Sequence, residues 1–286
     1  MASTANTPRI ATEEAAHLLL EDYAKLAQIH HTPCASGSLV WRRWGEGEPV
    51  MLLHGSHGYW AHWIHNIPAL MAKYSLWLPD LPGMGESAEP ETLTHAGIFE
   101  PLAAGMRQLS IGKASLVGFS YGGMIATNLA ASHPDLVRSL IIVGTGGLDT
   151  PLGPLNLRSM KDLTPEERYE ANLHNLAELM LHDRAAIDPL AVHIHSSGAR
   201  RNRINVRPLV LPDNVVRVLP RVTTPVSAIW GEHDAAHPAP AMQEAALRSQ
   251  IADCRFAVVP DAGHWCMFEQ PDHFNAILAD MLDYQR

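Results

Sequence analysis

Cysteine is scarce in this sequence, and its spacing excludes the common cysteine-based sites. The 286 residues include 3 cysteines, Cys34, Cys254 and Cys266, with no C-x-x-C spacing. An odd, scattered set argues against a secreted disulfide framework and favours a reducing compartment. A chain of this length buries about three quarters of its unfolded surface, so it needs neither disulfide nor metal to fold.

Long apolar segments are also missing. The N-terminus, MASTANTPRI, lacks the apolar centre of a signal peptide, and no run approaches the roughly 20 residues that a membrane-spanning helix requires. We therefore expect a cytoplasmic protein that has no membrane partner.

Positive charge is in deficit, with 21 Lys and Arg against 30 Asp and Glu, a net charge of −9. This balance disfavours nucleic acid and anionic membranes as main partners. The exception is ARRNRINVR, which holds Arg200, Arg201, Arg203 and Arg207. These arginines form either a solvated face or an anion site, for example for a substrate carboxylate.

Metal and dinucleotide motifs are absent from the sequence. Although there are 17 histidines, none falls into an H-E-x-x-H or H-x-H-x-D-H arrangement. No G-x-G-x-x-G follows an apolar segment. We expect no metal and no cofactor, and we interpret the close histidine pairs as surface or pocket residues: His62 and His65, His193 and His195, His233 and His237.

What the sequence does contain is a series of short apolar runs that alternate with helix-like segments. Most runs are continuously apolar, as in strands covered on both faces of a parallel sheet. The alternation predicts an α/β fold with helices on both sides of a mostly parallel sheet. The predicted strands are SLVWRRWG, PVMLLHG, SLWLPD, ASLVGF, SLIIVG, VSAIWG and RFAVVP.

Two regions interrupt this alternation. Residues 12–31 have helical periodicity, with Thr12 as N-cap and Glu13 and Glu14 in the first turn. From about Leu148 to Arg221 no strand is predicted, and TPEERYEANLHNLAELMLHD forms a helix with proline in its first turn. We divide the chain into an N-terminal helical arm (1–37), a first core part (38–147), an inserted helical cap (148–222) and a second core part (223–286).

The stretch VGFSYGG carries the chemistry. Gly118 and Gly122 flank Ser120 between an apolar run and a helix-like one. A sharp strand-to-helix turn crowds its neighbours, so the residues two before and two after the serine must lack side chains. The turn would expose the Ser120 hydroxyl at the C-terminal edge of the sheet, where α/β sheets bind ligands.

A serine needs a base before it becomes a nucleophile, and that base needs an acceptor that orients it. His264 follows the last predicted strand and is our candidate base, with capping of the last helix as the alternative. Asp234, directly after another strand, is the candidate orienting acid, and Glu232 and Asp261 are rivals.

The oxyanion that forms during acyl transfer needs preorganised donors. We predict the backbone N–H of Tyr121 and one from HGSHGYW, preferably that of Ser56 and less so that of His57. Gly55 and Gly58 would let this loop approach the substrate closely.

Together these residues resemble the α/β-hydrolase fold family. The matching pieces are HGSHG at 54–58, DLPGMGES at 80–87, GFSYGG at 118–123, GEHD at 231–234 and DAGHW at 261–265. Ser120, Asp234 and His264 occur in the family's order of nucleophile, acid and base. The resemblance covers the chain from Ser38 onward and implies a capped serine hydrolase, whereas the fold alone leaves the substrate open.

Within that family, GHWCMFEQPDHFN is similar to the tail of the carbon–carbon bond hydrolases of aromatic degradation, which carry Trp after the catalytic His. Two departures count against that substrate. HGSHGYWAHW has less glycine than their oxyanion loop, and His195 stands near their cap arginine, with Arg200 and Arg201 a few residues on. We therefore favour an ester or lactone and keep cleavage of a vinylogous diketone as the alternative. A lyase, a cofactor-independent oxygenase and a non-catalytic receptor rank lower.

The predicted substrate is a small to medium molecule with an apolar acyl side, anionic at one end if the arginines face inward. Homodimer formation stays open. The residues expected to contact the substrate are His57, Trp60, Phe119, Arg200, Arg201 and Trp265.

Overall fold

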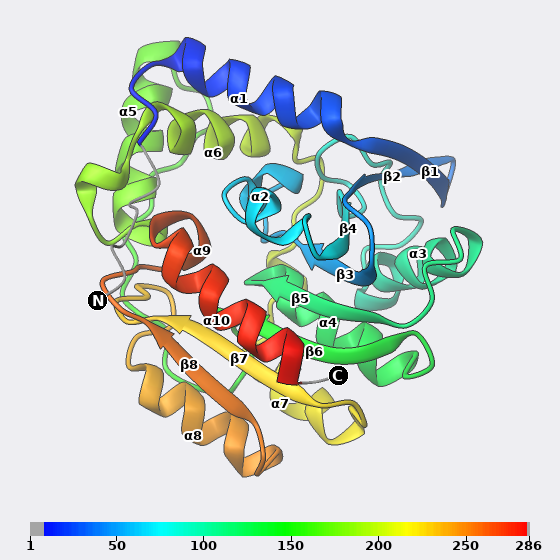
Figure 1. Cartoon of the computed structure of the whole chain (residues 1–286). Coiled ribbons are helices and arrows are strands. Elements are labelled where there is room, and N and C mark those ends of the chain that lie inside the picture. Colours follow the sequence, from blue (N-terminus) through cyan, green and yellow to red (C-terminus); the bar gives the residue numbers. More distant parts are fainter. Residues whose placement is uncertain (1–8, 285–286) are drawn as a thin grey trace.

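The computed structural model describes residues 9–284 and is built on an eight-stranded sheet (Figure 1). The strand order is β1-β2-β4-β3-β5-β6-β7-β8; β1 and β2 run antiparallel to their neighbours, and the remaining pairs are parallel. The predicted, mostly parallel sheet is therefore confirmed. The strands are β1 (Gln28–Cys34), β2 (Gly37–Trp44), β3 (Glu48–Leu53), β4 (Tyr74–Pro79), β5 (Ala114–Phe119), β6 (Val137–Val143), β7 (Val226–Gly231) and β8 (Arg255–Val259).

The continuous apolar runs are explained by two cores, one on each face of the sheet. Successive strand residues point to opposite faces, so Leu52 joins one core and Leu53 the other. Helices cover both faces, with α9 and α10 on the near side in Figure 1. The helical elements of this core are η1 (Trp60–Trp63), α2 (Ile67–Leu70), α3 (His95–Gln108), α4 (Tyr121–Ser132), α8 (Pro240–Gln250), α9 (Cys266–Glu269) and α10 (Pro271–Tyr284).

Between β6 and β7 lies the stretch that we interpreted as a cap. Residues 148–222, all of which the structure describes, contain helical elements and no strand. Thr164 and Glu167 form a reciprocal capping box at the start of α5, with Pro165 in its first turn, as the sequence indicated. The elements are α5 (Pro165–Asn175), the π-helical η2 (Leu176–Met180), η3 (Arg184–Ala186), α6 (Pro189–Arg201), η4 (Arg207–Leu209), α7 (Asn214–Val218) and η5 (Leu219–Arg221).

The N-terminal prediction was right at its start and wrong at its end. Helix α1 (Glu13–Leu26) begins after Thr12, whose side chain accepts a hydrogen bond from the Ala15 N–H. However, residues 28–34 form β1, which pairs with β2 at the edge of the sheet, so the helix does not extend to residue 31. The partner is the next strand, joined to β1 by a turn at Ala35 and Ser36, and pairing in this hairpin overrides the helical pattern of residues 28–31.

Helix α1 lies along α6 (Figure 1), and the residues before it are tied to the cap. The Arg9 guanidinium lies 2.9 Å from the Asp183 carboxylate, and the Ile10 N–H donates to Asp188 at 3.0 Å. The described part of this arm therefore packs on the cap as well as joining the sheet.

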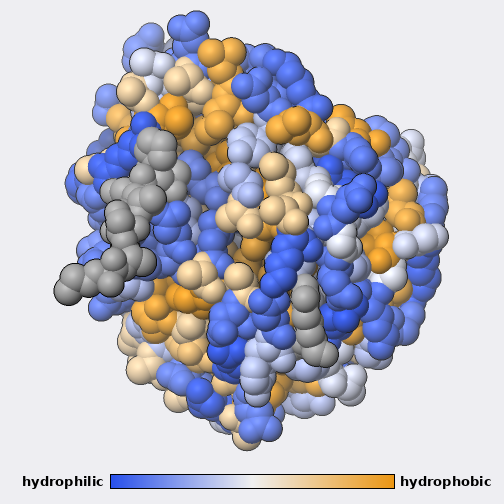
Figure 2. Space-filling view, viewed as in Figure 1, coloured by the Kyte–Doolittle hydropathy of each residue, from blue (hydrophilic) through white to orange (hydrophobic). Residues whose placement is uncertain are grey.

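Hydrophilic residues cover most of the face shown in Figure 2, with hydrophobic patches over α1 and the cap in the upper part of the view. Leu18 of α1 and Tyr169 of α5 are among the exposed large apolar side chains. Within residues 9–284, the helices all fall short of the length and apolar character needed to cross a bilayer.

Candidate active site

Ser120 occupies a strained turn between β5 and α4. Its φ of 53° and ψ of −118° lie outside the regions that side chains favour, and its N–H donates to the Val143 carbonyl at 2.8 Å. A Cβ on Gly118 would come within 2.5 Å of the Gly122 carbonyl oxygen, and one on Gly122 within 2.5 Å of the Leu53 carbonyl oxygen. Both positions therefore require glycine because the turn leaves no room for a side chain, as the sequence predicted.

The structure brings His264 and Asp234 to this serine. His264 Nε2 lies 3.0 Å from Ser120 Oγ, and His264 Nδ1 lies 2.8 Å from Asp234 Oδ2. The three residues follow β5, β7 and β8, whose C-terminal ends share one edge of the sheet. The rivals of Asp234 lie elsewhere: Glu232 accepts a hydrogen bond from the Asp261 N–H, and both are exposed.

Asp234 is held as a carboxylate. Its Oδ1 accepts the Ala236 and His237 N–H groups at 2.9 and 3.0 Å. Burial alone would raise the pKa of Asp234, but the adjacent His264 and His237, by charge and hydrogen bonding, together lower it well below its usual value. A carboxylate at this position stabilises the imidazolium that forms when His264 takes the Ser120 proton.

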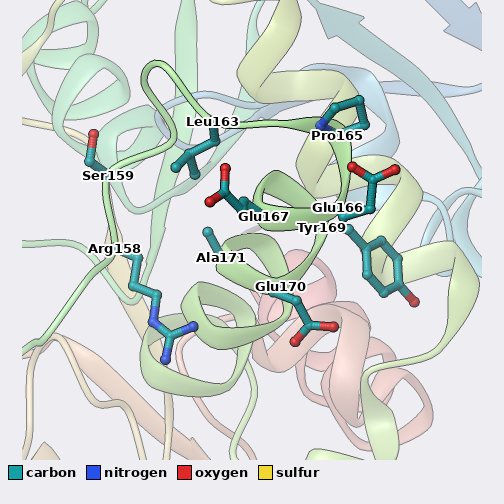
Figure 3. A pocket seen from close by; sticks show the side chains of 9 residues that line it. All are labelled: Arg158, Ser159, Leu163, Pro165, Glu166, Glu167, Tyr169, Glu170 and Ala171. Atoms are coloured by element: carbon teal, nitrogen blue, oxygen red, sulfur yellow. The ribbon is translucent and has the colours of Figure 1, made fainter.

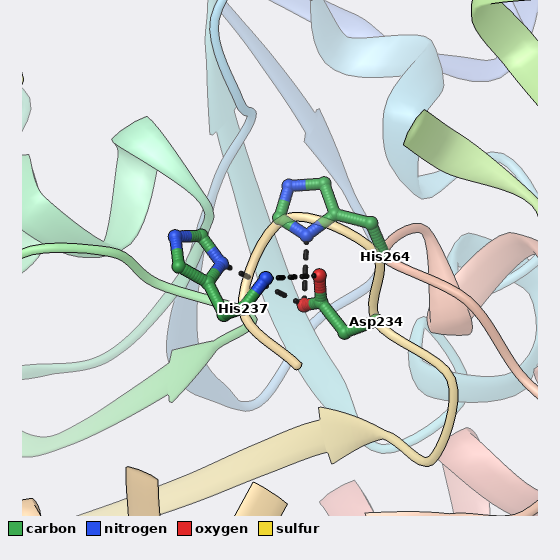
Figure 4. A group of neighbouring side chains, drawn as sticks. All are labelled: Asp234, His237 and His264. Atoms are coloured by element: carbon green, nitrogen blue, oxygen red, sulfur yellow. Dashed lines mark hydrogen bonds and ion pairs between the residues drawn. The ribbon is translucent and has the colours of Figure 1, made fainter. Parts of the chain in front are cut away.

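His237 is a neighbour of this group that the sequence reasoning missed. Its Nδ1 lies 3.7 Å from Asp234 Oδ2, and its ring centroid lies 5.5 Å from that of His264 (Figure 4). The three side chains are close enough together to ligate a metal ion. We interpret them as an acid–base group instead, because His264 uses both ring nitrogens toward Asp234 and Ser120.

His54 and His62 fix the backbone of the loop that follows β3 and carries Ser56. The Leu81 N–H donates to His54 Nε2 at 2.9 Å, so Nδ1 carries the proton that is donated to the Gly55 carbonyl at 2.8 Å. The Gly55 N–H in turn donates to His62 Nδ1 at 3.3 Å. Burial lowers the pKa of both imidazoles, that of His62 strongly, and keeps them neutral. The loop that carries Ser56 is thereby held at the edge of the sheet beside Ser120.

A cavity of about 270 Å³ opens onto these groups. Among the residues that line it, Arg158 is the one formal cation, and none is a carboxylate. Its walls come from the Ser56 loop, the Ser120 turn, the His264 loop and the cap. The lining residues are Gly55, Ser56, His57, His62, Phe119, Ser120, Leu157, Arg158, Met160, Asn175, Leu179, Met180, His195, Ala199 and His264.

A larger hollow of about 760 Å³ lies on the outside of the cap (Figure 3). It is bounded by the segment around Arg158 and Leu163 and by α5, including Glu166 and Glu170. Ser120, Asp234 and His264 are not among its lining residues. We assign the active site to the smaller cavity because that cavity contains the nucleophile and the base.

Of the residues predicted to contact substrate, His57 and Phe119 line the cavity, whereas Trp60 and Trp265 do not. Trp60 packs against Trp44, with ring centroids 5.4 Å apart. Trp265 is fully buried; its indole N–H donates to the His62 carbonyl at 3.0 Å, behind the cavity wall. The prediction is wrong for both tryptophans, because their rings complete the apolar core.

Arg200 and Arg201 are also outside the lining set. Arg200 donates to Ser197 Oγ at 3.0 Å and borders an outer hollow of the cap. Arg201 lies over the Tyr59 ring at 5.1 Å and 3.9 Å from the Glu86 carboxylate. Arg203 donates to the Gly85 carbonyl at 3.1 Å. Arg200 and Arg201 were predicted to contact the substrate, with a solvated face as the alternative; neither lines the Ser120 cavity, so the structure favours the solvated face.

The sequence reasoning missed Arg158, which does line the cavity. Its N–H donates to Asn175 Oδ1 at 2.8 Å, and its carbonyl accepts from Asn175 Nδ2 at 2.9 Å. The irregular segment before α5 is thereby fixed against α5. No motif marks this arginine in the sequence, since only the path of the chain brings it to the cavity.

Sequence comparison supports the identity of the fold. Residues 48–183 match a model of the alpha/beta hydrolase fold. A 2-hydroxy-6-oxo-6-phenylhexa-2,4-dienoate hydrolase from Burkholderia cepacia is 29% identical over 256 residues, covering 83% of this chain and 88% of its own. A hydrolase of the same name from Comamonas testosteroni is also 29% identical, covering 91% of this chain and 96% of its own.

Solved structures show the same architecture. An esterase from Rhodococcus has a TM-score of 0.77 at 20% identity, covering 90% of this chain and 99% of its own. A meta-cleavage product hydrolase from Pseudomonas fluorescens has a TM-score of 0.74 at 22% identity, covering 90% and 98%. These identities support the fold and leave the substrate open. The protein therefore has the alpha/beta hydrolase fold, is similar in sequence to hydrolases of that fold, and brings Ser120, His264 and Asp234 into one hydrogen-bonded group.

Proposed function

We propose that this protein hydrolyses a carboxylic ester or lactone through an acyl-enzyme on Ser120. The observation that carries the proposal is the 3.0 Å contact between Ser120 Oγ and His264 Nε2, two residues that line the same cavity. A serine in hydrogen-bond reach of an oriented imidazole is the arrangement required for acyl transfer.

The reaction follows from the positions of these groups. Ser120 Oγ attacks the acyl carbonyl while His264 Nε2 takes its proton, and the Asp234 carboxylate stabilises the imidazolium through Nδ1. His264 then protonates the leaving alcohol. Water enters, gives its proton to His264, and releases the acid from Ser120 by the same steps in the second half.

We assign the oxyanion to the backbone N–H groups of Tyr121 and Ser56. Tyr121 is the first residue of α4, where N–H groups have no partner within the helix and the positive end of the helix dipole lies. Ser56 lines the same cavity as Ser120, on the loop that His54 and His62 hold. Donors fixed in this way stabilise the charge that develops in the transition state.

The cavity supports a small to medium substrate with an apolar part. Phe119, Leu157, Met160, Leu179 and Met180 provide apolar walls. With no carboxylate among its described lining residues and several imidazoles in their place, the cavity suits an uncharged or anionic small molecule better than a cation.

Carbon–carbon bond hydrolysis of a vinylogous diketone is the second candidate. It is favoured by the names of the sequence relatives, which are dienoate hydrolases. It is also favoured by Arg158, a cation in the cavity wall that can pair with a carboxylate at one end of a substrate. Against it stand the two sequence departures: a Ser56 loop with less glycine than in those hydrolases, and His195 near the position of their cap arginine.

The test compares p-nitrophenyl esters of graded chain length with lactones and one vinylogous diketone. We expect the best ester to be cleaved with a burst of released alcohol and with covalent labelling at Ser120. Ser120→Ala should lower turnover about 10⁴-fold or more and leave the circular dichroism spectrum unchanged. Full activity in that variant would refute the proposal, and a preference for the diketone would favour the second candidate.

A further inference from the structure

A buried hydrogen-bond pair inside the cap determines the chemistry of one cavity wall. Asn172 on α5 is 1% exposed, and its side chain lies between Val192 and His195 of α6. Burying an amide is costly unless its polar atoms are paired. Here both polar atoms of the Asn172 amide have a partner, so the amide can orient the His195 ring that it contacts.

The Asn172 amide fixes which nitrogen of His195 carries the proton. Asn172 Nδ2 donates to the Val192 carbonyl at 3.2 Å. Because a carbonyl oxygen can only accept a hydrogen bond, the NH₂ group of the amide must face Val192, and this determines the orientation of the amide. Asn172 Oδ1 therefore faces His195 Nδ1, and the ring nitrogen donates to it. In a neutral imidazole the other nitrogen, Nε2, is then a bare acceptor.

The His195 ring stays neutral under ordinary conditions. Burial, with a smaller effect from His57, lowers its pKa to about 4. His195 and Ala199, one turn apart on α6, both line the cavity that holds Ser120. In the part of the chain that the structure describes, Nε2 of His195 makes no hydrogen bond, although Nδ1 does.

Helix α6 is packed tightly against the Ser56 loop. A Cβ on Gly198 would lie 2.0 Å from the His57 carbonyl oxygen, so no larger residue fits at that position without moving the backbone. This contact sets the distance between the His195 ring and the loop that carries Ser56. The acceptor is therefore built into the wall and does not sit on a mobile surface chain.

We propose that His195 Nε2 accepts a hydrogen bond from a hydroxyl group of the substrate, which makes His195 a specificity residue for hydroxylated esters. The inference rests on the proposed function, because it requires the Ser120 cavity to bind the ester. A site that binds a hydroxyl through a fixed partner discriminates against the analogue that lacks it, since that partner is left unpaired.

The experiment uses pairs of esters that differ by one hydroxyl, placed on the acyl chain in one series and on the alcohol chain in the other. Hydrolysis is followed with a pH indicator. In the wild-type enzyme we expect kcat/KM for the hydroxylated member of at least one series to exceed that of its partner about tenfold or more. His195→Leu should bring that ratio to about 1.

Further variants separate the acceptor from the fold. His195→Gln retains an acceptor oxygen and should preserve part of the preference. Asn172→Leu removes the group that fixes the tautomer and should reduce the preference without changing His195. His193→Leu is the matched control, because His193 lies on the same helix but borders the outer hollow, and it should keep the wild-type ratio.

Binding to Ser120→Ala, measured by calorimetry with the same esters, separates this inference from the catalytic proposal. Tighter binding of the hydroxylated ester that is lost in the Ser120→Ala, His195→Leu double variant supports the inference even if the esters are not cleaved. Equal kcat/KM and equal affinity within both series, or a preference that survives His195→Leu, would overturn it.

Discussion

The two walls of the cavity are built differently. On the sheet side, Ser120 sits on a strained turn between glycines that admit no Cβ, and buried imidazoles hold the Ser56 loop. On the cap side, Asn172 of α5 holds the His195 side chain, and Asn175 of α5 holds the backbone of Arg158, whose side chain is otherwise exposed. The comparison teaches that the reactive groups depend on a turn that tolerates few substitutions. The choice of substrate depends on cap side chains, which can be replaced without disturbing that turn.

The largest effect should come from Asp234→Asn on the sheet side. The amide keeps the shape but cannot hold His264 in the tautomer that accepts the Ser120 proton, so we expect kcat to fall about 10⁴-fold. The measurement is kcat with the best p-nitrophenyl ester, beside a thermal unfolding curve. A loss smaller than tenfold would mean that another group orients His264.

Gly122→Ala tests the backbone origin of the nucleophile turn. The added Cβ would meet the carbonyl oxygens of Leu53 and His54 at 2.5 Å, so we expect the free energy of unfolding to fall by about 3 kcal/mol. Gly112→Ala is the comparison, since no atom lies within 4 Å and only its φ of +76° is unfavourable, at about 1 kcal/mol. Equal losses, measured by urea unfolding, would show that crowding at the turn is not the cause.

The partly buried imidazole of His195 in the cap wall predicts a pH effect on stability. The unfolded chain takes up a proton on His195 near its ordinary pKa of 6.5, whereas in the folded protein the pKa is about 4. Below about pH 6.5 the unfolded state therefore binds more protons, and stability falls as the pH falls toward about 4. Relative to His195→Gln, the wild type should lose up to about 1.4 kcal/mol for each pH unit in that window. Parallel stability curves for the two proteins would contradict this.

The smallest expected change is in the recognition of charge by the cap wall. Arg158→Gln should raise KM about three- to tenfold for esters that carry a carboxylate at one end, because a partly exposed cation contributes modestly. Neutral esters should change less than twofold. Arg168→Gln, on the outer side of α5, is the control and should match the wild type. An equal rise in KM for both kinds of ester would indicate a packing effect, and would contradict the pairing of Arg158 with a substrate carboxylate.

Prediction from sequence succeeded where the signal is local. Seven strands, the helix with Pro165 in its first turn and the glycines around Ser120 depend on neighbours a few residues away. It failed for β1, where pairing with the next strand overrides a helical pattern, and for Trp265, whose position beside a motif did not put it in the cavity. Arg158 was not predicted because no motif lies near it, and only the path of the folded chain brings it to the cavity.

By itself, the sequence determined the α/β-hydrolase fold, the strained position of Ser120 and the order in which nucleophile, acid and base occur. Hydrophobic periodicity and glycine placement act over short stretches of chain, so they can be recognised without coordinates. Only the tertiary structure decided that Arg200 and Arg201 lie outside the cavity lining and that Asn172 fixes the proton on His195. Those outcomes depend on how the helices of the cap pack on one another and on the sheet, and that packing brings together residues whose sequence separation carries no signal of contact.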